Sequence, residues 1–185
     1  MPLPLEKLCP DYDVRMAVFR AVDAPIAALT VAELCQRAGI TRKRFYNLFG
    51  DKDGVFRWYL DLCFTASLYE IGRSFTWREG VCACLSYIAD VAVIFDAVER
   101  DRTAAPSRFW SMNQARKEQM RITLGQRGIA PNRQLELEME LYSTNVPFLI
   151  RNWVGCHGEV SVDEYADYWV DCVPQALREA LSPEG

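Results

Sequence analysis

The sequence is short of the residues on which most enzyme active sites and metal centres depend. Its 185 residues include one histidine, His157, and no Cys-x-x-Cys pair or glycine-rich phosphate-binding loop. His157 follows Cys156, but no further ligand lies at a spacing that is typical of zinc sites. Because no nucleophile–base pair is visible either, we expect no enzymatic activity, no metal and no other cofactor.

Long apolar runs are missing as well. The uncharged apolar run at residues 91–95 is far shorter than the ~20 residues that cross a bilayer. The first seven residues, MPLPLEK, lack the basic start, apolar middle and small-residue end of a secretory signal. Hydrophobic residues make up 50% of the chain and charged residues 25%, as in ordinary globular proteins. We therefore expect a cytoplasmic protein that does not bind membranes.

The seven cysteines are odd in number, and most of them fall within apolar helical stripes. This pattern favours reduced, buried thiols that behave as small hydrophobic side chains. The alternative is a thiol sensor, for which Cys82 and Cys84 are the closest pair. Residues two apart on a helix point to different sides, so a direct disulfide between them has poor geometry.

Positive charge is concentrated near the N-terminus, although the net charge of the chain is −4. Residues 1–60 contain nine Lys and Arg against seven Asp and Glu. A compact basic patch in an acidic protein is typical of local contact with phosphate groups, but a solvated face has the same composition. The bases of this patch are Arg37, Arg42, Lys43, Arg44, Lys52 and Arg57.

Apolar residues recur with helical spacing along the whole chain, and no strand pattern or internal repeat is found. The sequence therefore predicts an all-α fold. Capping boxes are expected at Thr30 with Glu33, at Thr76 with Glu79 and at Ser161 with Glu164, and Pro147 and Pro174 are expected to kink the last two helices. The predicted helices cover residues 12–23, 30–38, 41–49, 51–64, 76–95, 106–126, 132–155 and the segment from 161 onward.

The last two predicted helices carry apolar stripes with alternating spacings of three and four residues. This alternation suits helices that cross at a shallow angle in a bundle. The stripes could pair with the same helices of a second chain, or they could face the core of their own chain. The candidate dimer-interface residues are Leu135, Met139, Tyr142, Val146, Leu149, Trp153, Val162, Tyr165, Trp169 and Cys172.

The helices at 30–38 and 41–49 are joined by Gly39 and Ile40, which is a helix-turn-helix arrangement. In the second helix Phe45, Leu48 and Phe49 lie at positions i, i+3 and i+4, so they can pack it against its neighbours. The other face then presents polar side chains to solvent. Arg and Lys can donate to guanine, Asn can bond adenine bidentately, and hydroxyl groups suit phosphate oxygens.

Residues 30–55, TVAELCQRAGITRKRFYNLFGDKDGV, resemble the DNA-binding signature of the TetR family of transcription regulators. Two features depart from the family pattern: Leu48 replaces a frequent His, and Lys43-Arg44 replaces a small residue followed by an uncharged one. The first removes one phosphate contact, and the second is expected to tighten binding or to shift its sequence preference. The matching positions are Thr30-Val31, Ala38-Gly39-Ile40-Thr41, Phe45-Tyr46, Phe49 and Lys52-Asp53.

The resemblance implies a DNA-binding domain at residues 1–50 and a larger helical domain at 51–185 for effector binding and dimerisation. It implies a homodimer on a palindromic operator, usually a repressor that an unknown small molecule releases. The alternative is a TetR-like adaptor that acts through a protein partner; the acidic overall charge and Leu48 favour this alternative slightly, and the basic triplet at 42–44 opposes it.

The sequence provides candidate residues for a DNA-contacting surface and for an effector pocket. The candidate DNA-contacting residues are Thr30, Thr41, Arg42, Lys43, Arg44, Tyr46, Asn47 and Lys52. The residues that could line an effector pocket are Tyr87, Phe109, Trp110, Asn113, Tyr142 and Asn145, although each is also explained as an ordinary core residue.

Overall fold

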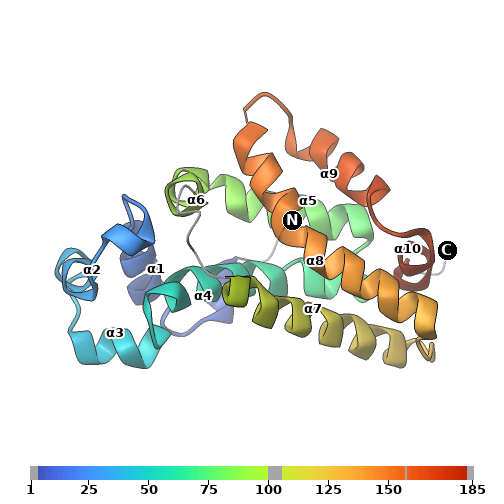
Figure 1. Ribbon diagram of the computed structural model, residues 1–185, viewed down its shortest axis with the longest axis horizontal. Helices are drawn as coiled ribbons and strands as arrows, with labels where there is room; N and C mark the ends of the chain where they lie inside the picture. Colours follow the sequence, from blue (N-terminus) through green and yellow to red (C-terminus); the bar gives the residue numbers. More distant parts are fainter. Residues whose placement is uncertain (1–3, 100–105, 157, 183–185) are drawn as a thin grey trace.

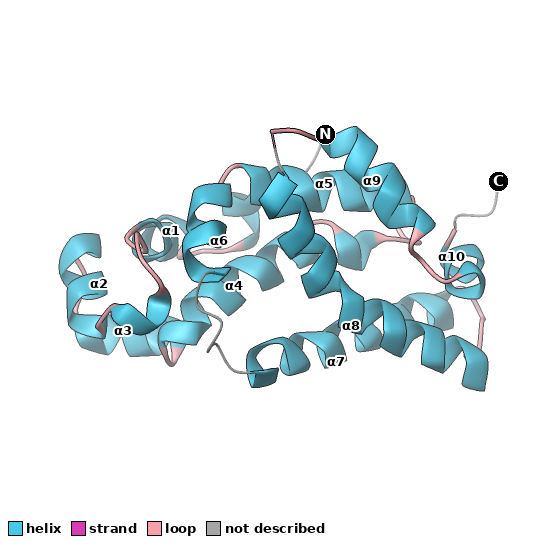
Figure 2. Cartoon of the chain, turned by 45° about the horizontal axis from the view of Figure 1, so that its top comes forward, coloured by secondary structure: helices cyan, strands magenta, loops and turns pink. Residues whose placement is uncertain are grey.

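The computed structural model describes residues 4–99, 106–156 and 158–182, with side chains except at 96–99 and 106–111. Within these ranges the chain has no β-strand, and its regular structure is helical apart from an isolated bridge between Ile71 and Phe75 and a bridge residue at Val160 (Figure 2). The predicted all-α fold is thus confirmed. The helices are α1 (Tyr12–Arg20), α2 (Val31–Ala38), α3 (Arg42–Phe49), α4 (Lys52–Thr65), α5 (Trp77–Ala89), α6 (Ala92–Glu99), α7 (Pro106–Gln126), α8 (Arg133–Cys156), α9 (Val162–Asp171) and α10 (Gln175–Leu181), with short 3₁₀ turns η1 (Leu5–Leu8), η2 (Ile26–Ala28) and η3 (Leu68–Glu70).

The first three helices gather at one end of the molecule, and α4 runs from them into the larger group of helices (Figure 1). The junction is aromatic: the Phe19 ring of α1 stacks on Tyr59 of α4 with centroids 4.4 Å apart. Both residues are buried. Since α4 packs against α1, α3, α5 and α7, it connects the two ends of the molecule.

The predicted helix at 76–95 is two helices in the structure. The α5 helix ends at Ala89, and the Val91 N–H bonds to the Ile88 carbonyl three residues back, at 3.1 Å. This tighter bond interrupts the helical ladder before α6 begins at Ala92. The apolar stripe survives the break, because Ile88 and Phe95 are both buried.

Pro174 ends a helix rather than kinking one, so this prediction was wrong. The α9 helix stops at Asp171, and Pro174 then precedes the first residue of α10. Proline has no N–H to continue a helical ladder, and it disfavours helical backbone at the residue before it. Pro147, in contrast, lies inside the uninterrupted α8 helix.

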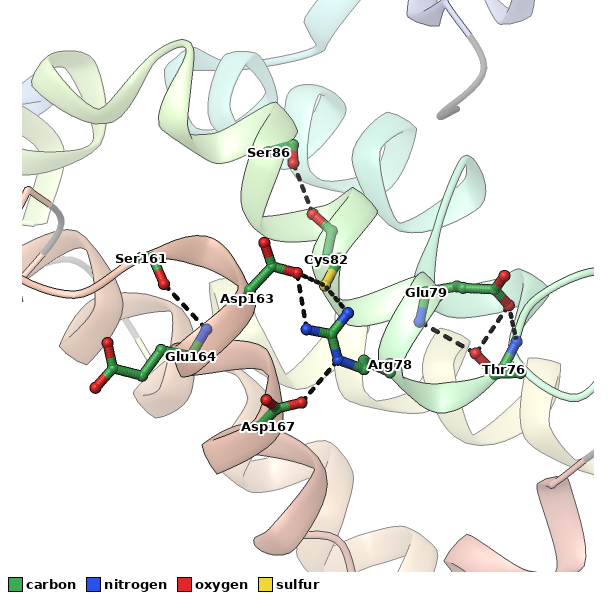
Figure 3. Close-up of polar contacts among 9 residues, drawn as sticks. All are labelled: Thr76, Arg78, Glu79, Cys82, Ser86, Ser161, Asp163, Glu164 and Asp167. Carbon is green, nitrogen blue, oxygen red and sulfur yellow. Dashed lines mark hydrogen bonds and ion pairs between the residues drawn. The ribbon is translucent and has the colours of Figure 1, made fainter.

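Polar pairs join helices of the larger group. Between α7 and α8, Arg121 donates to both carboxylate oxygens of Glu136, at 2.9 and 2.6 Å. Between α5 and α9, Arg78 contacts Asp163 and Asp167, each at 2.8 Å (Figure 3).

The predicted capping boxes at Thr30 and Thr76 are complete, whereas Ser161 accepts from the Glu164 N–H without the reciprocal bond.

The apolar stripes of α8 and α9 lie mainly in the core of their own chain. Met139, Val146 and Trp169 are fully buried without a second chain. Leu135, Tyr142 and Trp153 are also buried, Leu149, Val162 and Tyr165 are half-buried, and Cys172 is exposed. Six of the ten residues predicted as a dimer interface are thus buried in the core of their own chain, and the dimer contact of the others stays a prediction. The burial of the six follows from α7 packing on α8 and α5 packing on α9.

Candidate nucleic-acid interface

The inner face of α3 is fixed by aromatic packing. Phe45 is fully buried, and its ring lies 5.3 Å from that of Phe49, which also meets Trp58 of α4 at 6.1 Å. Arg15 of α1 stands over the Phe49 ring at 5.2 Å and donates from Nη1 to the Leu48 carbonyl at 2.7 Å. The helix is therefore held from both α1 and α4, which sets the direction of its outer face.

The turn between α2 and α3 depends on glycine. Gly39 has φ +66°, which residues with a side chain rarely adopt. The Ile40 N–H bonds to the Cys35 carbonyl at 3.0 Å, and the Gly39 N–H bonds to Gln36, which is the Schellman arrangement. Thr41 then caps α3 by accepting from the Arg44 N–H at 3.2 Å. The predicted helix-turn-helix geometry is thus present.

The outer face of α3 presents an aromatic ring and several polar groups to solvent. Tyr46 is 52% exposed, which is high for a side chain of its size. The prediction that the polar side chains of this helix point away from the core is confirmed. The exposed residues are Thr41, Arg42, Lys43, Arg44, Tyr46 and Asn47.

The charges on this surface are partly balanced by neighbouring acids. Arg44 pairs with Asp11 at 2.8 Å, Arg37 with Asp23 at 2.6 Å and Arg57 with Asp51 at 3.3 Å. Within the residues that the structure describes, Arg42 and Lys43 make no ion pair. These two side chains therefore carry unbalanced positive charge on the exposed face of α3. The exposed pair of Arg44 is weak enough to exchange for another anion.

Two predicted contact residues have structural tasks. The Lys52 Nζ donates to the carbonyls of Ile26 at 2.9 Å, Ala27 at 3.3 Å and Leu29 at 2.6 Å. It thus stabilises the turn that leads into α2, a role that differs from the predicted phosphate contact. The Thr30 hydroxyl is used in the capping box with Glu33, at 2.7 and 3.2 Å. Their DNA contacts stay predictions.

The predicted effector-pocket residues do not all come together. Asn113 and Tyr142 lie near Arg116, a buried base of α7 that the sequence did not single out. Asn145 is exposed on the outer side of α8, and the Tyr87 carbonyl accepts from the Tyr59 hydroxyl at 2.7 Å. The side chains of Phe109 and Trp110 lie outside the described residues.

All seven cysteines are free. Burial raises the pKa of Cys84 to about 12 and raises that of Cys63 well above its ordinary value. Cys82 lies 3.8 Å from an Arg78 nitrogen (Figure 3), yet its partial burial also raises its pKa. Thiols with raised pKa values are poor nucleophiles, so these three favour the interpretation as core residues.

Comparisons with known proteins support the fold. No family model and no curated protein match the sequence. Among solved structures, a TetR transcriptional regulator from Rhodococcus sp. RHA1 matches with a TM-score of 0.52 and 14% identity, over 95% of this chain and 94% of that one. NalD, the secondary repressor of the MexAB-OprM multidrug efflux pump in Pseudomonas aeruginosa, gives a TM-score of 0.47 and 15% identity over 95% and 99%. The first of these matches shows that the chain has the all-helical fold of TetR regulators.

None of the helices within the described residues is long and apolar enough to cross a membrane.

Proposed function

We propose that the protein is a TetR-type transcription regulator that binds double-stranded DNA through the outer face of α3. The observation that carries this proposal is the two-sided character of that helix. Phe45 and Phe49 are locked into the core, while Arg42 and Lys43 reach solvent with no acidic partner in the described structure. A rigid helix with such a face suits the major groove.

The side chains of this face divide by chemistry. Arg42 and Lys43, at the exposed N-terminal end of α3, suit phosphate oxygens, as do the hydroxyls of Thr41 and Tyr46. Arg44 and Asn47, one turn apart, can reach base edges, where guanine accepts from Arg and adenine pairs with Asn. Arg44 then has to leave Asp11, so DNA would replace one exposed ion pair with a base contact.

We also propose a homodimer, formed by the exposed side of α8 and α9 rather than by the buried positions of their stripes. The outer side of α8 exposes Leu141 and Phe148 at 58% and 64%, and Tyr168 of α9 is 70% exposed. Leu141 and Phe148 border a groove of about 340 Å³ between α8 and the segment at 172–174. A second copy that covers this apolar surface would place two α3 helices on one duplex, with half-sites ~34–36 Å apart.

Regulation would act through α4, which touches both ends of the molecule. A small molecule among the helices of the larger group could displace α4 and so change the separation of the two α3 helices. To weaken DNA binding a hundredfold, it must prefer the displaced conformation by ~2.7 kcal/mol. We propose that the protein acts in this way in the cytoplasm, as a ligand-responsive repressor.

A TetR-like adaptor that acts through a protein partner is the second candidate. The pairing of Arg37, Arg44 and Arg57 with acids favours it, since it reduces the free positive charge for DNA. A pull-down with and without nuclease separates the two, because partners that are retained after nuclease treatment do not depend on DNA.

Selection of bound sites from a random DNA pool tests the proposal. We expect enrichment of a palindrome whose half-sites lie about one helical turn apart. A variant with Arg42, Lys43 and Arg44 changed to Ala serves as the control, since these exposed positions can be replaced without disturbing the core. Equal recovery of every sequence by the protein and its control would refute DNA recognition.

A further inference from the structure

Arg116 of α7 is a buried base for which the described part of the chain provides no acidic partner. It is 3% exposed, and no carboxylate within the described residues pairs with it. Its Nη2 donates to the Asn113 side chain and to the Ser143 carbonyl, the latter at 2.8 Å, and its guanidinium stands 5.2 Å from the Phe64 ring centroid. The Nε–H has no hydrogen-bond partner. A buried guanidinium normally has a carboxylate or its equivalent nearby.

One of these contacts has a structural explanation in α8. In a helix the carbonyl of residue 143 would accept from the N–H of residue 147, but Pro147 has no N–H. Arg116 donates to the carbonyl that Pro147 leaves unpaired. This contact explains one hydrogen bond of the guanidinium, but it explains neither the positive charge nor the unpaired Nε, because a neutral donor would serve the carbonyl equally well.

The neighbouring bases of α7 show what this position lacks. Lys117 pairs with Glu140, and Arg121, one turn further along, pairs with Glu136. Burial lowers the pKa of Arg116, and the neighbouring Tyr69, Tyr142 and Cys84 side chains act in the opposite direction. The Ser143 hydroxyl beside it also has no partner. Two residues that touch in the core thus each have a polar group without a hydrogen-bond partner among the described residues.

Two small apolar cavities flank this arginine. One of about 10 Å³ is bounded by Phe56, Leu60, Phe64, Phe95, Met112, Pro147 and Ile150, together with Arg116. The other, of about 20 Å³, lies on the side of Trp77 and Tyr142. Each has room for about one water molecule, so a larger guest has to push the helices apart. Phe56 and Leu60 belong to α4, so a guest in the first cavity would press on the helix that follows α3.

We propose that Arg116 is the anchor of a binding site for a small amphipathic carboxylate. The carboxylate would accept from the Arg116 Nε–H, and the apolar body would widen the cavity beside Phe56, Leu60 and Phe95. The guest would supply the negative charge that the described residues do not place beside Arg116. That the guest is the effector rests on the proposed function, whereas binding itself does not require DNA.

Calorimetry on the protein without DNA tests the proposal, with phenylacetate and octanoate as probes and phenylacetamide and octanamide as their uncharged counterparts. The variants are Pro147→Ala, which restores the helical partner of Ser143, and Arg116→Met combined with Pro147→Ala. In the second variant the structural task of Arg116 is already met by Ala in place of Pro147, so a loss of binding reports on charge recognition.

We expect at least one carboxylate to bind about tenfold more tightly than its amide, both to the unaltered protein and to Pro147→Ala. In the double variant the preference should fall to about twofold or less. Failure of both carboxylates to bind, or a preference that survives loss of Arg116, would overturn the proposal. DNA binding measured separately on the ligand-free protein shows whether the proposed function fails on its own.

Discussion

The two ends of the molecule treat positive charge in opposite ways. At the α3 end, Arg42 and Lys43 have no acidic partner among the described residues and reach solvent, where water screens them. In the larger group of helices, Arg116 also has no acidic partner among the described residues. It is buried, so its charge raises the free energy of the folded state.

The comparison shows that the lack of an acidic partner has different consequences at the surface and in the core. On the surface it leaves a base available to a macromolecular anion at little cost in stability. In the core it requires compensation from within the fold, which here comes from Asn113, the Ser143 carbonyl and Phe64. The same unpaired charge therefore suits DNA at one end and a small guest at the other.

The largest effect is expected within α3 itself. Phe45→Ala removes a fully buried ring and should reduce the free energy of unfolding by about 3–5 kcal/mol. Its neighbour Tyr46 is 52% exposed, so Tyr46→Ala should cost less than about 0.5 kcal/mol. Urea denaturation of both variants measures this contrast. Similar losses from the two would mean that α3 is not packed as described.

The next prediction separates a structural base from an exposed one. Lys52→Ala removes the donor to three backbone carbonyls and should cost about 1.5–3 kcal/mol of stability. Lys43→Ala should leave stability nearly unchanged and weaken DNA binding. Thermal unfolding and binding assays on both variants check the contrast. If Lys52→Ala instead weakened DNA binding without affecting stability, the phosphate-contact role of Lys52 would be supported over the structural one.

Release of Arg44 should have a smaller effect. Asp11→Asn removes the acidic partner of Arg44, which is a half-exposed ion pair. DNA binding should become tighter by at most about 1 kcal/mol, because surface pairs of this kind are weak. Asp23→Asn is the matched control, since it frees Arg37 of α2 rather than a base of α3. Titration of a fixed duplex measures both, and a gain only in the control would contradict the role given to Arg44.

The smallest effect is expected from changes in the two complete capping boxes, one at each end of the molecule. Bonds from the Thr30 backbone and hydroxyl lower the pKa of Glu33 below its ordinary 4.5, and Thr76 does the same for Glu79. A lowered folded-state pKa stabilises the protein above the unfolded value, and this contribution is lost as pH falls through the folded value. Glu33→Gln and Glu79→Gln should therefore each flatten the loss of thermal stability below pH 4.5. A steeper loss of thermal stability below pH 4.5 in either variant would contradict the stabilising role of its carboxylate.

Local signals in the sequence predicted the helix-turn-helix end of the molecule well. The Thr30 capping box, Gly39 and the spacing of Phe45 and Phe49 act within a few residues, so their effects could be read along the chain. The resemblance to the TetR family extended this reading to the fold as a whole. The roles of individual residues in DNA contact stay predictions.

Other features depended on contacts between distant residues and could not be read in this way. The stripes of α8 and α9 suited either a partner chain or their own core, and only the packing of α5 and α7 shows which of their residues are buried within the chain. Lys52 meets carbonyls more than twenty residues earlier in the chain. Arg116 and Pro147 become related only when α7 and α8 lie side by side, so nothing local to either residue indicated the pair.

The central claim is that the outer face of α3 binds the DNA, and the salt dependence of binding tests it most directly. On a selected palindromic duplex, the double variant Arg42→Ala/Lys43→Ala should bind more weakly than the unaltered protein. Its slope of log affinity against log salt should be shallower by about 0.9 for each phosphate that the variant no longer neutralises. An unchanged affinity and slope in a variant of unchanged stability would contradict the account.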